Sequence, residues 1–177
     1  MKTRSLLRYV VSLTFAAVAI LVVANAVGAQ RGNVDWAAVG LSTHHVAGTV
    51  HYLEGRGGNI GLSVGDDGVI MIDDQYAPLT DRIVETIRGL STAEIKWLIN
   101  THVHPDHTGG NENFGNRGVP ILAQDRVRLR LAATQPEAAL PVLTYSEDVT
   151  IHLNGEEVHI VPVPPAGPAA LPTTPAF

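Results

Sequence analysis

Three histidines and an aspartate fall within six residues, His102-Val103-His104-Pro105-Asp106-His107, directly after the apolar run Ile95–Ile99. That run predicts a short buried strand, so the cluster begins where a strand ends and a loop opens to solvent. Open α/β sheets place their binding sites at such strand ends. The spacing of His102 and His104 does not fit one face of a helix, but it fits an irregular turn, which Pro105 favours.

The absence of cysteine narrows the chemistry of this cluster. Among 177 residues there is none, which excludes disulfides, thiolate zinc sites and cysteine nucleophiles. A metal must therefore be held by imidazole and carboxylate, which are ligands that Zn²⁺ accepts. Asp106 and His107 are adjacent and diverge enough to address a second ion, so the cluster predicts a site for one or two ions.

The segment able to fold, Trp36 to about Val163, has a mixed α/β pattern. Short apolar and β-branched runs separated by glycine-containing turns predict consecutive antiparallel strands over His45–Leu53, Asn59–Val64 and Val69–Asp73. Apolar residues at helical spacing after Pro78 predict an amphipathic helix with a buried stripe of Leu79, Ile83, Ile87 and Leu90. A further strand is expected over Pro120–Gln124 and a further helix over Asp125–Ala133.

A last hairpin is expected from Val149 to Val161, centred on Asn154-Gly155, a dipeptide suited to a type I′ turn. The two-residue turn fixes its register, which pairs Leu153 with Glu156, His152 with Glu157, Ile151 with Val158, Thr150 with His159 and Val149 with Ile160. His152 and His159 then fall on the polar face. The remaining histidines, His44, His45 and His51, have no carboxylate at a useful spacing and are expected to be surface or edge residues.

The cluster with its continuation, Thr108-Gly109-Gly110-Asn111, resembles the signature of the metallo-β-lactamase superfamily. Val69–Asp73 resembles the family's strand that ends in an aspartate before the first helix. The resemblance runs from roughly Val46 to Val163. It implies an αββα sandwich, of which this chain would hold the first half and one hairpin of the second.

The resemblance also implies roles for the residues. His102 and His104 would hold one zinc, Asp106 and His107 would contribute to a second, and Asp73 would brace the metal loop. A water with its pKa lowered by the metals would attack an acyl or phosphoryl centre, with Asp106 orienting it. Family substrates include lactams, lactones, thioesters and phosphodiesters, and iron or manganese could replace zinc.

Both ends of the chain differ in composition from the middle. Lys2, Arg4 and Arg8 precede an uncharged, mostly apolar run, and small residues follow, which predicts a secretory signal. Cleavage after Ala29 or after Ala26 would fit, with Ala29 favoured, and the protein is hence expected to be periplasmic or secreted. If this segment stayed uncleaved, it would anchor the chain in a membrane. Residues 164–177 are Pro-rich and are expected to be disordered or extended.

The chain departs from the family pattern near Ala166, where Gly167 stands at the position expected for a third metal-binding histidine. The later residues contain no His, Asp, Glu or Cys, which suggests a truncated or frameshifted reading frame and an impaired site. With much of the second half-sandwich missing, the sheet is expected to expose an apolar face and the chain to be poorly stable.

Three functions stay open. The first is a zinc-dependent hydrolase that acts on a small-molecule substrate. The second is a non-catalytic metal-binding remnant, and the third is a membrane-anchored interaction protein. The net charge of −5, without a long block of like charge, argues against a nucleic-acid partner. A serine-hydrolase site is not expected, because no G-x-S-x-G motif occurs.

Overall fold

The structure is a computed structural model that describes residues 34–163. The expected signal segment, residues 1–29, and the expected Pro-rich tail, residues 164–177, lie outside the described residues, as does the departure near Ala166. One compact unit begins at Trp36, and the description below concerns its described part. Within residues 34–163, none of the helices has the length and apolar character needed to cross a membrane.

A seven-stranded sheet, whose strands lie side by side in chain order, forms the centre of the unit. Its strands are β1 (Ser42–Ala47), β2 (Val50–Glu54), β3 (Ile60–Gly65), β4 (Gly68–Ile72), β5 (Ile95–Asn100), β6 (Ile121–Gln124) and β7 (Leu143–Tyr145). The first four pair antiparallel, as hairpins allow. The last four pair parallel, because helical segments connect them.

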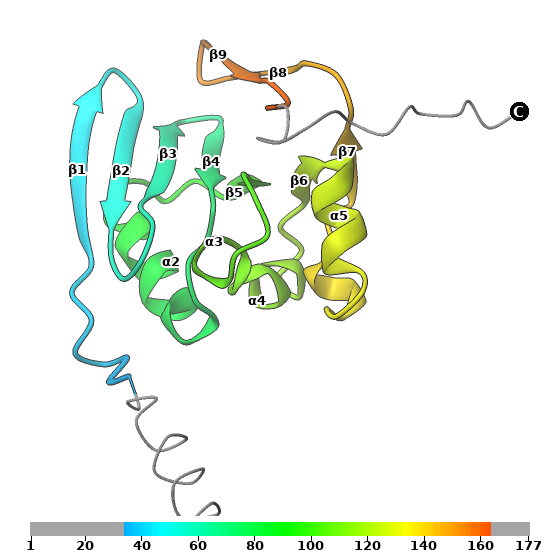
Figure 1. The fold of residues 1–177 in the computed structure, drawn as a ribbon. Helices are drawn as coiled ribbons and strands as arrows, with labels where there is room; N and C mark the ends of the chain where they lie inside the picture. Colours follow the sequence, from blue (N-terminus) through cyan, green and yellow to red (C-terminus); the bar gives the residue numbers. More distant parts are fainter. Residues whose placement is uncertain (1–33, 164–177) are drawn as a thin grey trace, which may run out of the picture. The chain divides into compact units, whose positions relative to one another are not determined.

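The helical segments lie together on one face of this sheet (Figure 1). They are η1 (Ala77–Leu79), α2 (Thr80–Arg88), α3 (Pro105–Thr108), α4 (Asn111–Gly115), α5 (Asp125–Leu131) and η2 (Glu137–Ala139). Three residues of the predicted buried stripe, Leu79 of η1 and Ile83 and Ile87 of α2, pack in the main core, and the fourth, Leu90, is partly buried against it. Leu62 of β3, Met71 of β4 and Leu98 of β5 belong to the same core, because their side chains point to the face of the sheet that the helices cover.

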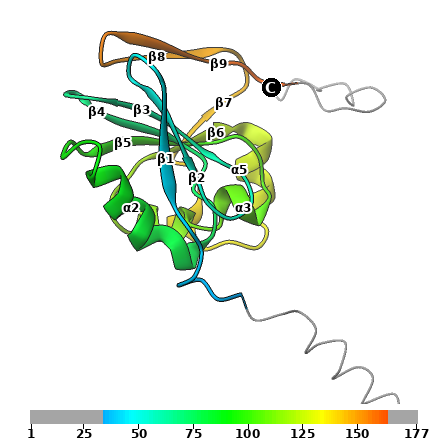
Figure 2. The same cartoon turned by 90° about the vertical axis from the view of Figure 1, so that its left-hand side faces the viewer.

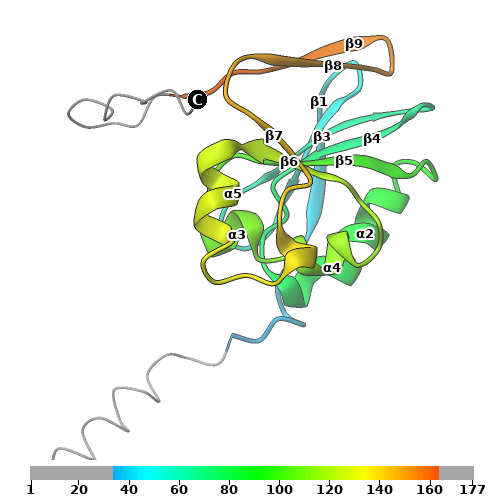
Figure 3. The same cartoon turned by 90° about the vertical axis from the view of Figure 1, so that its right-hand side faces the viewer.

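A separate two-stranded sheet, β8 (Val149–Leu153) and β9 (Glu156–Ile160), lies over the opposite face (Figures 2 and 3). Its apolar side chains pack against Ile70, Ile99 and Leu122, which are 1, 4 and 1% exposed. The expectation of an uncovered apolar sheet face is therefore wrong for this part of the sheet. The hairpin supplies the missing layer because its apolar residues share one face.

The register of this hairpin is the predicted one at all five residue pairs, from Val149 with Ile160 to Leu153 with Glu156. Asn154 and Gly155 have φ values of 57° and 72°, as a type I′ turn requires. The Asn154 side chain also attaches the hairpin to the β3–β4 turn, because its Oδ1 accepts from Asp67 N at 3.1 Å and its Nδ2 donates to Gly68 O at 3.0 Å.

An Asn154→Ala variant is expected to unfold with a free energy about 1–3 kcal/mol lower, because both side-chain bonds and the residue best suited to positive φ are lost. Urea unfolding followed by circular dichroism measures this. His152→Ala on the same hairpin is the matched control, because His152 is exposed. Equal stability of the two variants would mean that Asn154 does not hold the hairpin in place.

Two expectations about the elements are corrected, and two short elements were not predicted. The run His45–Leu53 is two strands, because Gly48, with a φ of 53°, lies in a turn that folds β1 back against β2. Pro105 begins the one-turn helix α3, where its fixed φ suits the first helical position, and the irregular stretch ends before it. The short elements β7 and α4 have too few residues to show a period in the sequence.

Candidate metal centre

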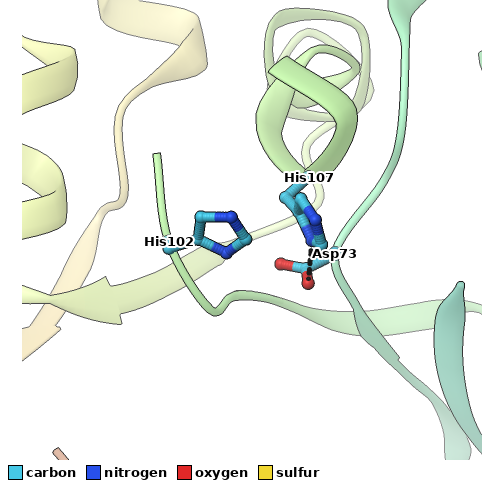
Figure 4. Close-up of side chains that lie close together, drawn as sticks. All are labelled: Asp73, His102 and His107. Atoms are coloured by element: carbon cyan, nitrogen blue, oxygen red, sulfur yellow. Dashed lines mark hydrogen bonds and ion pairs between the residues drawn. The ribbon is translucent and has the colours of Figure 1, made fainter. Parts of the chain in front are cut away.

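The cluster lies at the carboxyl ends of the neighbouring parallel strands β4 and β5. Asp73 directly follows β4, and His102 follows β5 after Thr101. His102 and His104 lie in an irregular stretch, whereas Asp106 and His107 lie in α3. Figure 4 shows the His107 ring against the Asp73 carboxylate, with the His102 ring to one side of them. Asp73 and His102, which are 29 positions apart in the sequence, lie close together because the two strands that precede them run parallel.

Asp73 connects these segments. It is 4% exposed and has a φ of 63°, a conformation that Asp tolerates better than most residues. Its Oδ1 accepts from Thr101 N at 2.8 Å, and its Oδ2 accepts from Thr101 Oγ1 and His107 Nδ1, each at 2.7 Å. The proton on His107 Nδ1 leaves a lone pair on Nε2, the arrangement found in histidines that bind metals.

Two ligand pairs have the spacing that one ion requires. Two atoms bound to zinc at about 2.0–2.1 Å are themselves about 2.9–3.4 Å apart. His102 Nε2 lies 3.0 Å from His104 Nδ1, and His107 Nε2 lies 3.4 Å from Asp106 Oδ2. The rings of His102 and His107 are 4.0 Å apart between centroids. This donor set of imidazoles and a carboxylate fits zinc or a similar divalent metal.

Asp73, His102 and His107 also form a group whose potential ligand atoms lie within 4.8 Å of one another. Both carboxylate oxygens of Asp73 already accept hydrogen bonds from Thr101 or His107. Asp106 has its carboxylate beside His107 Nε2, the nitrogen that Asp73 leaves open. We therefore assign Asp73 to positioning and Asp106 to the candidate ligands.

The pKa of His102 lies below its ordinary value of 6.5, chiefly because burial disfavours the charged ring and next because His107 is close. Asp73 and Asp106 oppose this shift only in part. A lower pKa keeps the imidazole neutral near pH 7, and a neutral imidazole is the form that binds a metal.

A glycine loop between β2 and β3 passes against the cluster. A Cβ on Gly57 would lie 2.8 Å from Asp106 Cβ, and one on Gly58 would lie 2.6 Å from His107 Cε1. Buried Gln75 holds this loop, since its Oε1 accepts from Arg56 N at 3.1 Å and its Nε2 donates to Gly58 O at 2.5 Å. Glycine is needed here because the backbone approaches the candidate ligands so closely.

A buried pair of amides lies under the cluster. Asn100 is 0% and Asn111 is 1% exposed, and each Nδ2 donates to the other's Oδ1, at 3.0 and 2.9 Å. Asn111 Nδ2 also donates to Ala139 O at 2.9 Å. The pair thus joins the end of β5 to the start of α4 and to η2.

Asp74 is a buried acid next to the cluster. Its Oδ1 accepts from Gly110 N at 2.9 Å, whereas its Oδ2 has no hydrogen-bond partner among the described residues. Burial raises the pKa of Asp74 well above 3.8, the charge of Asp73 adds to this, and the bond from Gly110 opposes it. The carboxyl therefore favours its neutral form in the folded chain.

This raised pKa predicts a pH dependence. Between the ordinary and the raised pKa the folded chain binds more protons than the unfolded chain, so the free energy of unfolding falls as pH rises through that range. In an Asp74→Asn variant, the part of this decrease that Asp74 contributes is expected to be absent. Urea unfolding with a chelator present, at about pH 5 and about pH 8, compares the two chains, which share every other titrating group. An equal change in both chains would contradict the assignment.

All five side chains expected from the sequence, Asp73, His102, His104, Asp106 and His107, therefore meet at one edge of the sheet. Four contributors to the site were missed: Asp74, Gln75, Asn100 and Thr101. Asp74 and Gln75 directly follow Asp73, and the Asp-Asp-Gln sequence after a buried strand was the one available signal. Asn100 and Thr101 act through partners that are distant in the chain.

Comparisons with known proteins agree with the fold. The family model described as the metallo-beta-lactamase superfamily matches residues 53–170. A metallo-beta-lactamase from Pontibacter korlensis is similar, with a TM-score of 0.57 and 20% identity over 68% of this chain and 59% of that chain. DIM-1 metallo-beta-lactamase has a TM-score of 0.56 and 18% identity over 66 and 56% of the two chains.

MEM-A1, a subclass B3 metallo-beta-lactamase from a soil metagenome library, has a TM-score of 0.56 and 24% identity over 70% of this chain and 52% of that chain. No curated protein matches the chain. The chain spans between 52 and 59% of the length of these three structures. The α/β fold is thus a partial metallo-beta-lactamase sandwich, as predicted.

Proposed function

Because this chain belongs to the metallo-beta-lactamase superfamily, we propose that it is a metal-dependent hydrolase whose metal is held by His102, His104, Asp106 and His107. The observation that carries the proposal is the ligand spacing, with His102 and His104 nitrogens 3.0 Å apart and the Asp106–His107 pair 3.4 Å apart. Zinc is the metal that this donor set favours, with one or two ions bound. Iron and manganese are the alternatives for the same ligands.

The roles follow from the contacts. A divalent metal bound there would lower the pKa of a coordinated water and polarise a carbonyl or phosphoryl oxygen. Asp73 keeps the proton of His107 on Nδ1, so that Nε2 faces Asp106. Asp106, whose Oδ2 lies 3.4 Å from His107 Nε2, would orient the attacking water beside the metal. The substrate class is an ester, lactam, thioester or phosphoester.

The test combines metal content with turnover. We expect the full chain, incubated with Zn²⁺ and dialysed, to retain one or two ions and to hydrolyse at least one member of a panel of β-lactams, lactones, thioesters and phosphodiesters. His102→Ala with His104→Ala should lose metal and turnover together. His152→Ala with His159→Ala is the matched control, because it also removes two histidines but from the exposed face of β8–β9.

The outcomes separate the candidate functions. Metal bound without turnover of any substrate would favour the non-catalytic metal-binding remnant. Equal metal content in the full chain and the His102/His104 variant would overturn the ligand assignment.

Export is a further part of the proposal, and it rests on the sequence of residues 1–29 alone. Cleavage after Ala29 would release a periplasmic or secreted enzyme. The intact mass of the chain recovered from expressing bacteria tests this, and an uncleaved mass would favour a membrane-anchored protein.

A further inference from the structure

Two histidines lie side by side on the β1–β2 hairpin, whose strands carry none of the cluster described above. His45 and His51 are directly opposite each other in the antiparallel pair, and their ring centroids are 4.9 Å apart, edge to face at 63°. The strand register shifts between His45 and Ala47. Such bulges turn a side chain away from its regular direction.

The hydrogen bonds of these two rings select their tautomers. His45 Nε2 donates to Gly48 O at 3.1 Å, and His51 Nδ1 donates to Thr49 O at 3.1 Å. A carbonyl oxygen can only accept, so each of these nitrogens carries the proton of the neutral ring. His45 Nδ1 and His51 Nε2 are left with lone pairs. Histidines that bind metals have this pattern, with the second nitrogen donating to a backbone carbonyl.

The centroid distance of the two rings matches that of two imidazoles bound to one ion. With a metal–nitrogen distance of about 2.0–2.1 Å, each ring centre lies about 3.2 Å from the ion. Two such rings have centroids about 4.5 Å apart at a right angle and about 5.2 Å apart at the tetrahedral angle. The observed 4.9 Å lies between these values.

The surroundings admit a cation. His45 is exposed and His51 is half-buried, so an ion can reach the pair from solvent. A carboxylate flanks the turn, since Glu156 Oε1 lies 3.4 Å from where a Cβ on Gly48 would be. A negative charge at the turn favours the approach of a divalent ion.

We propose that His45 Nδ1 and His51 Nε2 form a second metal site, a two-imidazole site for a divalent transition metal, with water at its remaining positions. Imidazole suits Zn²⁺, Ni²⁺ and Cu²⁺, and Cu²⁺ binds most tightly among these. The site needs no residue of the His102–His107 cluster. It stands whether or not the proposed hydrolase activity is found.

Cu²⁺ alone is the probe. The full chain titrated with Cu²⁺ in a calorimeter should bind one ion more per chain than the His45→Ala, His51→Ala double variant. The single His45→Ala variant should bind that ion about 100-fold more weakly, because the gain from linking two ligands is lost. Since His45 is exposed, this single variant keeps the fold, which circular dichroism verifies.

His44→Ala is the matched control. His44 is the neighbouring residue of β1 but points to the other face, where it stacks on Tyr52 at 4.6 Å and lies 3.3 Å from Glu54. The His44→Ala variant should bind as many Cu²⁺ ions as the unmodified chain. Unchanged Cu²⁺ count and affinity in the double variant would overturn the proposal. If the hydrolase proposal failed instead, the full chain would retain no zinc or hydrolyse no substrate, whereas the difference in Cu²⁺ binding between the full chain and the double variant would remain.

Discussion

An Asp73→Ala variant is expected to unfold with a free energy about 3–5 kcal/mol lower than that of the unmodified chain. Three donors, Thr101 N, Thr101 Oγ1 and His107 Nδ1, lose their acceptor together. Alanine also tolerates the observed φ of 63° less well than aspartate. Urea unfolding in the presence of a chelator measures the loss without a contribution from bound metal.

Asp73→Asn separates the folding role of this residue from its effect on the metal. Asparagine tolerates the same backbone conformation and retains one acceptor oxygen. If its amide group faces His107, however, it donates to Nδ1 and moves the ring proton to Nε2, the nitrogen proposed to bind metal. We expect a folded chain whose zinc affinity is lower by about 10- to 100-fold.

Competition against a chromogenic chelator measures that affinity. An exposed acid, Asp125 at the start of α5, provides the control as Asp125→Asn. Unchanged zinc affinity in Asp73→Asn would show that Asp73 does not set the tautomer of His107.

The amide pair under the cluster gives the second large effect. In Asn111→Leu, buried Asn100 loses one donor and one acceptor partner, and Ala139 O loses its donor. Because buried polar groups without partners cost about 1–3 kcal/mol each, we expect a loss of about 2–5 kcal/mol in the free energy of unfolding. Glu112→Ala, one position along α4 and exposed, should change it by less than about 0.5 kcal/mol.

A double-mutant cycle tests whether the two amides act as one unit. Asn100→Leu with Asn111→Leu removes both members, so neither amide stays buried without its partner. The double variant should be more stable than the sum of the single losses predicts, by at least about 1 kcal/mol. Additive losses would contradict a reciprocal pair.

Local signals in the sequence were enough for the elements that repeat a period or contain a defined turn. The helix over Leu79–Leu90 and the register of the Asn154-Gly155 hairpin followed from spacing and turn type. The β1–β2 hairpin did not, because Gly48-Thr49 lies inside a run that reads as one strand. The packing of β8–β9 on the open face of the sheet was also not predicted, because the alternation of apolar and polar residues in a hairpin does not say which surface it packs against.

The sequence by itself determined which residues are available for metal chemistry. Without cysteine, and with three histidines and an aspartate within six residues, imidazole and carboxylate were the remaining ligands. Only the tertiary structure decided how these ligands are held. Parallel pairing of β4 with β5 brings Asp73 to His107, and antiparallel pairing of β1 with β2 brings His45 to His51. The physical reason is that ring tautomers and ligand spacing depend on hydrogen bonds between segments, which the strand pairing sets.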